Sequence, residues 1–301
     1  MNDFVTMVEV GPRDGLQNEK LKLSASTKIE LIERLADCGI PVVEAGSFVS
    51  PKWVPQMADS GAVMKGLKPL PETRYPVLVP NLKGYQRAID AGATEIAIFT
   101  AASESFSQRN TNCSIDESIT RLEPVMHSAI NSGINVRAYV SCVLGCPYEG
   151  DIKTEAVSMI CKQLIKLGCD EISLGDTIGT GTPAAANELI YAVSSEVPVD
   201  RLAVHFHDTY GQALANILAC LDAGIRTIDS SVAGLGGCPY ANGATGNVAS
   251  EDVIYMLHGL GLTTGIDLRA LAKTGEWISK QLQRPNNSKA GLALNLSKLQ
   301  E

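Results

Sequence analysis

The 301-residue sequence lacks any apolar run of membrane-spanning length, because glycine, proline or charged residues interrupt the longest candidates. Its first residues show neither a signal-peptide pattern nor an arginine-rich transit pattern, and its last residues carry no retention or peroxisomal address. We therefore expect a cytoplasmic protein. The formal net charge of −8 disfavours nucleic acid and anionic membranes as partners, but a local group of cations can still bind an anionic small molecule.

The sequence also lacks paired CxxC elements, although it contains eight cysteines. Cys142 and Cys146 are four residues apart and Cys161 and Cys169 are eight apart, and neither spacing is typical of a zinc site. Most of the cysteines are therefore interpreted as small buried hydrophobic residues in a reducing compartment.

Strand-like and helix-like segments alternate along the chain, and a glycine follows many of the helix-like ones. Strands are expected at residues 6–10, 41–46, 75–79, 95–99, 135–140, 171–174, 202–207 and 227–232. Helices are expected at residues 26–38, 82–91, 115–131, 154–167, 184–195, 212–223 and 253–260.

Eight strands within roughly 250 residues are typical of a (β/α)8 TIM barrel. A doubly wound open sheet is the competing α/β fold, but it does not require eight units. We predict a single TIM-barrel catalytic domain over residues 1–301, with the barrel at about 4–262 and additional C-terminal helices at about 263–301.

Histidine is scarce, and two of the four histidines, His205 and His207, close one apolar strand. Alternate side chains of a strand share a face, so both imidazoles point the same way. Such a pair either binds one divalent cation or lies in the barrel core with its hydrogen bonds made to other protein groups, and the pair alone does not decide between these interpretations.

Polar residues recur where the expected strands end, which is where TIM barrels place their catalytic groups. One such position is a polar loop after the first strand. The candidates along the rim are Arg13, Asp14, Glu44, Ser47, Ser173, Asp176, His205, His207, Cys238 and Asn247. Each residue alone is weak evidence, but their shared placement on one rim predicts an active site.

A carboxylate and two imidazoles, from Asp14, His205 and His207, suit Mg²⁺, Mn²⁺ or a similar ion with positions left for substrate. Asn247 would add an amide oxygen. A metal that holds a substrate hydroxyl lowers the pKa of that hydroxyl. Arg13, beside the carboxylate, would stabilise an enolate oxygen as a bond breaks.

Residues 10–17 (VGPRDGLQ) and 231–240 (SVAGLGGCPY) resemble the two hallmark segments of the 3-hydroxy-3-methylglutaryl-CoA (HMG-CoA) lyase family. Residues 205–207 and 243–247 match the same family in order, and the resemblance runs from about residue 5 to beyond residue 285. The wider group, the DRE-TIM metallolyases, usually has Glu after Arg-Asp. Gly15 stands there, as in HMG-CoA lyases, which argues against the synthase branch.

The resemblance implies cleavage of HMG-CoA to acetyl-CoA and acetoacetate, with HMG-CoA and the acyl-CoA products as partners. It implies a divalent metal, Mg²⁺ or Mn²⁺, held by Asp14, His205, His207 and Asn247. It implies three further roles, in which Arg13 acts at the thioester enolate, Cys238 is a mobile acid, and Glu44 and Asp176 support the site. We also expect a homo-oligomer, for example a dimer.

Several assignments stay open at this level. Cys238 is either this acid or a packed thiol, although its glycine-rich setting fits a loop that closes over a site. His205 is the candidate base or proton shuttle, but a ligated imidazole is a poor base. Gln17 and Ser47 are expected to bind substrate. Lys20 and Lys22 are either CoA-phosphate ligands or solvated surface charges.

Two alternatives to HMG-CoA cleavage remain. One is a related metal-dependent lyase or aldolase acting on a similar 3-hydroxy-acyl-CoA. The other is a barrel that binds metal or acyl-CoA only as a scaffold, and the polar rim argues against it because a scaffold has no need of one.

Overall fold

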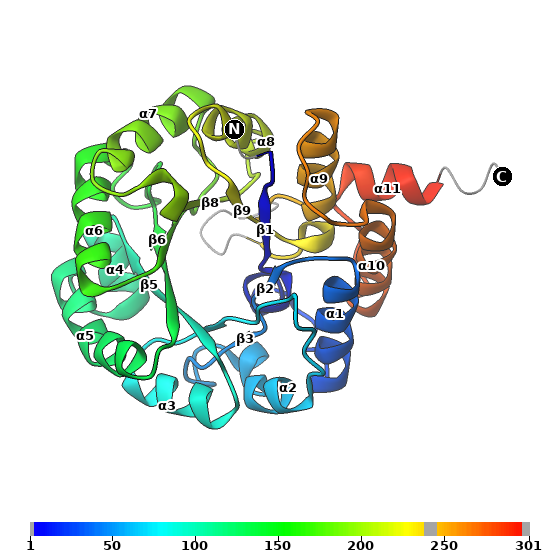
Figure 1. Cartoon of the computed structure of the whole chain (residues 1–301), viewed down its shortest axis with the longest axis horizontal. Helices are drawn as coiled ribbons and strands as arrows, with labels where there is room; N and C mark the ends of the chain where they lie inside the picture. The colour runs from blue at the N-terminus through cyan, green and yellow to red at the C-terminus, as the bar shows by residue number, and fades with distance from the viewer. Residues whose placement is uncertain (1–2, 238–245, 297–301) are drawn as a thin grey trace.

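The computed structural model describes residues 3–237 and 246–296, which form a parallel barrel enclosed by helices (Figure 1). The strands are β1 (Thr6–Glu9), β2 (Val42–Val43), β3 (Gly46–Ser47), β4 (Val77–Leu78), β5 (Glu95–Ala101), β6 (Asn135–Ser141), β7 (Glu171–Asp176), β8 (Leu202–Phe206) and β9 (Thr227–Ser230). The helices are α1 (Ala25–Asp37), α2 (Ser60–Gly66), α3 (Leu82–Asp90), α4 (Glu104–Thr111), α5 (Ile115–Asn131), α6 (Thr154–Leu167), α7 (Pro183–Ser194), α8 (Ala213–Asp222), α9 (Ser250–Gly259), α10 (Leu268–Gln281) and α11 (Lys289–Leu296). The (β/α)8 TIM barrel with additional C-terminal helices is confirmed.

The barrel closes through its second strand, which is divided into β2 and β3. β2 pairs with β1, and β3 pairs with β4, both in parallel. The two residues between them bond to different neighbours, because the Glu44 N–H donates to the Glu9 carbonyl and the Ala45 N–H to the Pro76 carbonyl, each at 2.9 Å. β2 and β3 therefore act as one strand that joins the two ends of the sheet order.

Two short helices were not expected from the sequence. α2 fills the second strand-to-strand crossover, for which no helix was expected, and α4 precedes α5 after β5. They contain only seven and eight residues, respectively, which is too short for a helical repeat of apolar residues to stand out. α4 instead has a start signal, since the Ser103 hydroxyl caps it by accepting the Phe106 N–H at 3.1 Å.

Strand alternation sorts side chains between two cores. Leu202, Val204 and Phe206 belong to the large apolar cluster that includes residues of the surrounding helices. The intervening residues point into the barrel, so His205 faces the interior. Inside the barrel the apolar clusters are small, for example that of Leu78, Ala97 and Tyr139. The remaining interior space is therefore available to polar groups.

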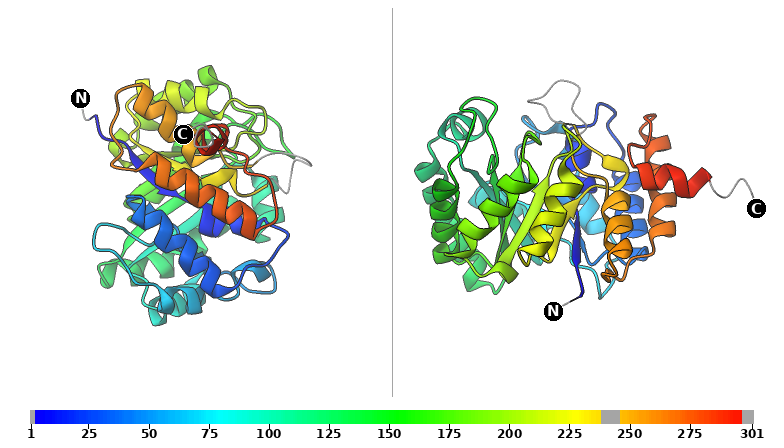
Figure 2. Two further views of the ribbon diagram at one scale, coloured as in Figure 1. Left: turned by 90° about the vertical axis from the view of Figure 1, so that its right-hand side faces the viewer. Right: turned by 90° about the horizontal axis from the view of Figure 1, so that it is seen from above.

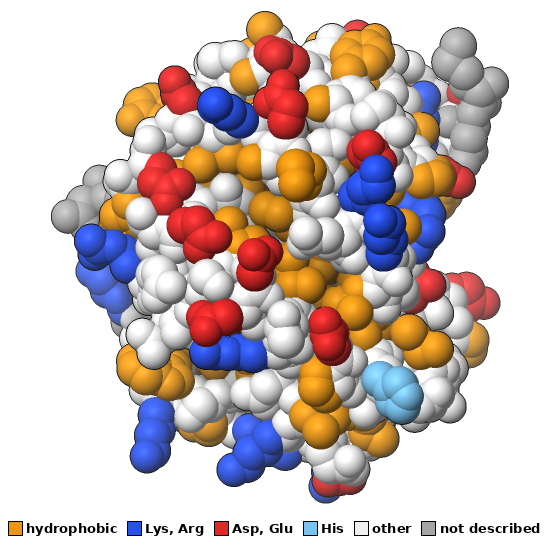
Figure 3. Space-filling model, turned by 90° about the vertical axis from the view of Figure 1, so that its left-hand side faces the viewer, with side chains coloured by type: hydrophobic (Ala, Val, Ile, Leu, Met, Phe, Trp, Pro, Cys, Tyr) orange, Lys and Arg blue, Asp and Glu red, His pale blue; other side chains and the backbone are white. Residues whose placement is uncertain are grey.

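The C-terminal helices lie outside the barrel, and α10 runs alongside α1 (Figure 2). On the face shown in Figure 3, acidic side chains lie among apolar and basic ones. Among the described residues, no helix combines the length and apolarity needed to span a membrane.

Candidate active site

The polar loop expected after the first strand is a π-helical turn over Gly11–Gly15. Such turns are rare and often occur at functional sites. Glu9, the last residue of β1, accepts a hydrogen bond from the Gly11 N–H at 2.8 Å and fixes the start of the turn. The turn places Arg13 and Asp14 together at the C-terminal end of β1.

Three potential metal ligands converge at this end of the barrel. Asp14, His205 and His207 each offer one donor atom, and these atoms lie within 4.8 Å of one another. A backbone bridge joins His207 to Asn247, whose side-chain amide donates to Asp14 Oδ2 at 2.8 Å. The four residues expected to bind metal are thus neighbours. In this arrangement the amide nitrogen of Asn247 faces Asp14, so ligation through its oxygen requires the amide to turn over.

The electrostatics of Asp14 and His207 suit a cation. Burial acts to raise the pKa of Asp14, but the charge of Arg13 and the nearby histidines lower that pKa to about 2. Burial and the neighbouring His205 lower the pKa of His207 to about 4. A metal binds the ionised carboxylate and the unprotonated imidazole nitrogen. This donor set therefore fits a divalent cation with coordination positions left for substrate.

The Arg13 guanidinium is buried and held by three neighbours. Its Nε donates to Glu44 Oε2 at 2.7 Å and its Nη1 to Asp14 Oδ1 at 2.8 Å. Its central carbon lies 5.3 Å from the ring centre of Tyr139. Burial raises the pKa of Glu44, against the opposing charge of Arg13. These contacts fix the plane of the guanidinium beside the three potential metal ligands.

A second buried network lies deeper in the barrel. Asp229, from β9, accepts hydrogen bonds from Arg137 Nη2 at 2.5 Å and from the Ser173 hydroxyl at 2.8 Å. Its Oδ2 also lies 3.2 Å from Nδ1 of His205. Burial acts to lower the pKa of His205, but the bond to Asp229 and the charge of Asp14 raise it overall.

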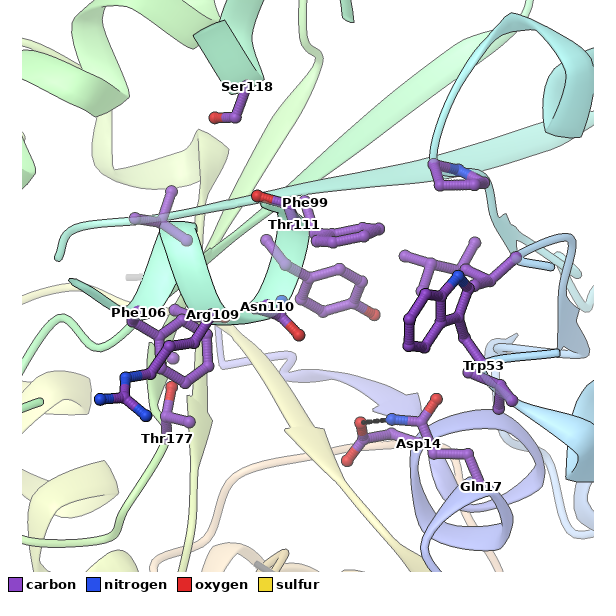
Figure 4. Close-up of a pocket in the computed structure, with 18 of the residues that line it drawn as sticks. Asp14, Gln17, Trp53, Phe99, Phe106, Arg109, Asn110, Thr111, Ser118 and Thr177 are labelled. Atoms are coloured by element: carbon purple, nitrogen blue, oxygen red, sulfur yellow. Dashed lines mark hydrogen bonds between the residues drawn. The ribbon is translucent and has the colours of Figure 1, made fainter. Parts of the chain in front are cut away.

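The site opens into a cavity of about 960 Å³ at the mouth of the barrel. Arg13, Asp14, Gln17, His205 and His207 line one part of it. Figure 4 shows Gln17 hydrogen-bonded to Asp14, and aromatic side chains of the cavity wall around the open space. Apolar and polar lining residues away from the metal ligands include Trp53, Phe99, Phe106, Arg109, Asn110 and Arg121. The cavity therefore joins a polar end to a mixed, partly aromatic chamber that suits an extended ligand.

The remaining candidates from the sequence occupy different positions. Gln17 lines the cavity and donates to Asp14 Oδ1 at 3.3 Å. Ser47 is buried at the end of β3, and its hydroxyl accepts from the Val49 N–H at 3.3 Å. Asp176 is also buried and accepts from the Gly181 N–H at 2.9 Å. Cys238 lies outside the described residues. The roles assigned to these residues remain predictions.

Sequence reasoning missed two buried acids, Glu9 and Asp229. Glu9 accepts hydrogen bonds from Gly11, from the Val232 N–H at 2.9 Å and from the Ser250 hydroxyl at 2.6 Å, so it joins the π-helical turn to the segment after β9. Burial raises the pKa of Glu9 to about 7. Each acid is the only charged residue of its strand, and that isolation was the available signal.

Comparison with known proteins gives consistent matches. The HMGL-like family model matches residues 4–278. The mitochondrial hydroxymethylglutaryl-CoA lyase of Arabidopsis thaliana is 60% identical over 292 residues, which is 97% of this chain and 62% of that protein. The chain thus spans less than two thirds of that relative's length.

Solved structures agree with the family model. The hydroxymethylglutaryl-CoA lyase of Pseudomonas aeruginosa has a TM-score of 0.97 and 55% identity, with 99% of each chain covered. An HMG-CoA lyase of Acinetobacter baumannii, solved in complex with coenzyme A and 3-methylmalate, has a TM-score of 0.93 and 35% identity, covering 97% of this chain and 95% of that one.

Proposed function

This chain belongs to the HMG-CoA lyase family, and from that premise we propose that it cleaves 3-hydroxy-3-methylglutaryl-CoA to acetyl-CoA and acetoacetate. The observation that carries the proposal is the convergence of Asp14, His205 and His207 with Arg13 at one end of a large cavity. The donor set suits a cation that binds substrate, and the guanidinium suits an oxygen that gains charge.

Asp14, His205 and His207 would hold a divalent cation, Mg²⁺ or Mn²⁺, with Asn247 beside them. When bound, the cation supplies Lewis-acid chemistry at the substrate hydroxyl, lowering its pKa and fixing its position. Asp14 prepares the site electrostatically, because the lowered pKa keeps its carboxylate ionised across the neutral range.

Cleavage requires the C3 hydroxyl to lose a proton while the C2–C3 bond breaks. The electron pair of that bond then moves into the thioester of acetyl-CoA as an enolate, and C3 becomes the ketone carbon of acetoacetate. Arg13 lines the cavity with its guanidinium fixed by Glu44 and Asp14. We assign it to the enolate oxygen, where a preorganised donor stabilises charge that develops in the transition state.

Two proton transfers complete the reaction. His205 is the proposed base or shuttle for the hydroxyl proton, a role that it can perform only while its Nε2, 4.0 Å from Asp14, does not bind the cation. Cys238 is the proposed acid that protonates the enolate carbon, and Gly237 beside it in the sequence lines the cavity. Glu44 positions Arg13, and Asp176 supports the rim through its bonds to the backbone N–H groups of residues 180 and 181.

The cavity volume supports an acyl-CoA ligand, since small-molecule sites commonly measure about 300–1,000 Å³. An acyl-CoA would place its acyl group at the metal ligands and extend its CoA moiety toward the aromatic chamber. Gln17 and Ser47 are proposed to contact the acyl part. We also propose a cytoplasmic location, a homo-oligomeric assembly, and roles in leucine degradation and ketone-body formation.

The experiment is product analysis with purified protein. Incubation with HMG-CoA and Mn²⁺ should yield acetyl-CoA and acetoacetate in equal amounts. Turnover of a related 3-hydroxy-acyl-CoA in place of HMG-CoA would support the alternative lyase or aldolase. Binding of acyl-CoA without turnover of any such thioester would support the scaffold.

A further inference from the structure

The carboxylate of Asp229 lies directly behind His205, inside the barrel. β8 and β9 are parallel neighbours, and their register pairs His205 with Asp229. Paired residues of adjacent strands point to the same face, so both side chains enter the interior. Asp229 is 1% exposed, and water is therefore excluded from the contact between its carboxylate and the imidazole.

Two donors fix this carboxylate. Arg137 Nη2 lies 2.5 Å from Oδ1, and the Ser173 hydroxyl donates to Oδ2 at 2.8 Å. Arg137 is itself anchored, because its Nε lies 2.7 Å from Glu171 and its guanidinium carbon lies 5.2 Å from the Tyr139 ring centre. A buried carboxylate in such an ion pair is ionised, and an ionised carboxylate can only accept hydrogen bonds.

The ionised Asp229 carboxylate determines which nitrogen of the His205 ring carries the proton. Its Nδ1 lies 3.2 Å from Oδ2 of Asp229, so Nδ1 must carry the proton of that hydrogen bond. The neutral ring then has its lone pair on Nε2, the atom 4.0 Å from Asp14. We propose that Asp229 is a positioning residue, which, held by Arg137 and Ser173, keeps His205 in the Nδ1–H tautomer and aims the Nε2 lone pair at the cation site.

This inference rests on the proposed function, because the Nε2 lone pair of His205 matters only if a cation binds at Asp14, His205 and His207. A carboxylate behind a ligating histidine fixes the ring's tautomer and orientation, and losing such a partner typically weakens metal affinity or activity by about 10–100-fold. The tautomer itself can be observed in the metal-free protein.

The substitution Asp229→Asn has an effect that the contacts define. Arg137 Nη2 requires an acceptor at the present position of Oδ1, so the asparagine places its carbonyl oxygen there. Its amide NH₂ then faces Nδ1 of His205 and can only donate. Nδ1 must become the acceptor, which moves the ring proton to Nε2 and points it at the cation site.

The test is nitrogen NMR of histidine-labelled, metal-free protein, read at a pH where the His205 ring is neutral. The chain has only four histidines, so single His→Gln variants assign the signals. We expect the Nδ1–H form in the unaltered protein and the Nε2–H form in Asp229→Asn. An Nε2–H ring in the unaltered protein overturns the proposal without any variant, which covers the case in which Asp229→Asn fails to fold.

Mn²⁺ affinity, measured by titration calorimetry, is the second readout. We expect Asp229→Asn to bind Mn²⁺ about 10–100-fold more weakly. Asp222→Asn, at an exposed position of α8, is the matched control and should change neither readout. An unchanged tautomer and affinity in Asp229→Asn, with normal Mn²⁺ binding and turnover by the unaltered protein, refutes the inference alone. Absence of Mn²⁺ binding and turnover in the unaltered protein refutes the proposed function instead.

Discussion

Replacement of Arg13 by lysine separates a transition-state role of this residue from a binding role. The guanidinium donates through Nε to Glu44 at 2.7 Å and through Nη1 to Asp14 at 2.8 Å. A lysine ammonium preserves the charge, but its single nitrogen cannot occupy both positions, and it loses the planar contact with Tyr139. Each charge-assisted hydrogen bond contributes about 1.5–3 kcal/mol. The ammonium therefore bonds to either Glu44 or Asp14, and this bond draws it away from the position beside the enolate oxygen.

Loss of one preorganised donor to a developing oxyanion costs about 10²–10³ in kcat. Arg13→Lys should therefore lower kcat by about that factor, because the lost interaction is made mainly in the transition state. Mn²⁺ affinity should be retained, since Asp14, His205 and His207 are intact.

The assay is steady-state acetoacetate formation at saturating Mn²⁺, with circular dichroism to verify folding. Arg74→Lys is the matched control, because Arg74 is half exposed and pairs with Glu95 at 3.3 Å outside the site, so its kcat should be unchanged. A change confined to KM in Arg13→Lys would show that this guanidinium only binds substrate, and would refute the enolate assignment.

Three further predictions concern the metal, the proposed acid and a buried carboxylate. Asp14→Ala and His207→Ala should each abolish Mn²⁺ retention and turnover in a folded protein, and full Mn²⁺ binding by His207→Ala would remove that residue from the ligand set. Cys238→Ser should bind Mn²⁺ and substrate nearly normally and lose about 10²–10⁴-fold in turnover, whereas turnover at the parent rate would identify the thiol as packing. Glu251 has a pKa raised by burial to about 8, above its unfolded value of 4.5, so the folded state keeps a proton between these values that the unfolded chain releases. The free energy of unfolding should therefore fall as pH rises through this window. Calorimetry should show that Tm falls less between about pH 5 and pH 8 in Glu251→Gln than in the unaltered protein. An equal fall in both proteins would contradict the raised pKa.

Most of the barrel was predictable because its signals are local. Apolar strand runs, helix repeats and the glycines after the helices each span a few residues, and together they predicted eight strands. The division of the second strand was not predictable, since it depends on Glu44 and Ala45 bonding to different neighbours once the barrel closes. The helix α2 was missed because it is short.

The residues of the site that lie at strand ends were predictable from the sequence. Asp14, His205 and His207 follow or close strands, and the structure brings them together. Asp229 was not predictable as a partner of His205, because their contact depends on the register between β8 and β9. The polar loop after β1 forms a π-helical turn that likewise depends on the Glu9 carboxylate, which accepts the Gly11 N–H. The order of residues in the sequence does not reveal this hydrogen bond.

The most direct measurement is HMG-CoA cleavage by chelator-stripped protein during stepwise addition of Mn²⁺. The proposed site has one set of ligands, Asp14, His205 and His207, in each chain. Acetoacetate formation should therefore be absent before addition, rise with Mn²⁺ and reach its plateau at one bound ion per chain. Full activity in the stripped protein, or no cleavage at any Mn²⁺ occupancy, would contradict metal-dependent HMG-CoA cleavage at this site.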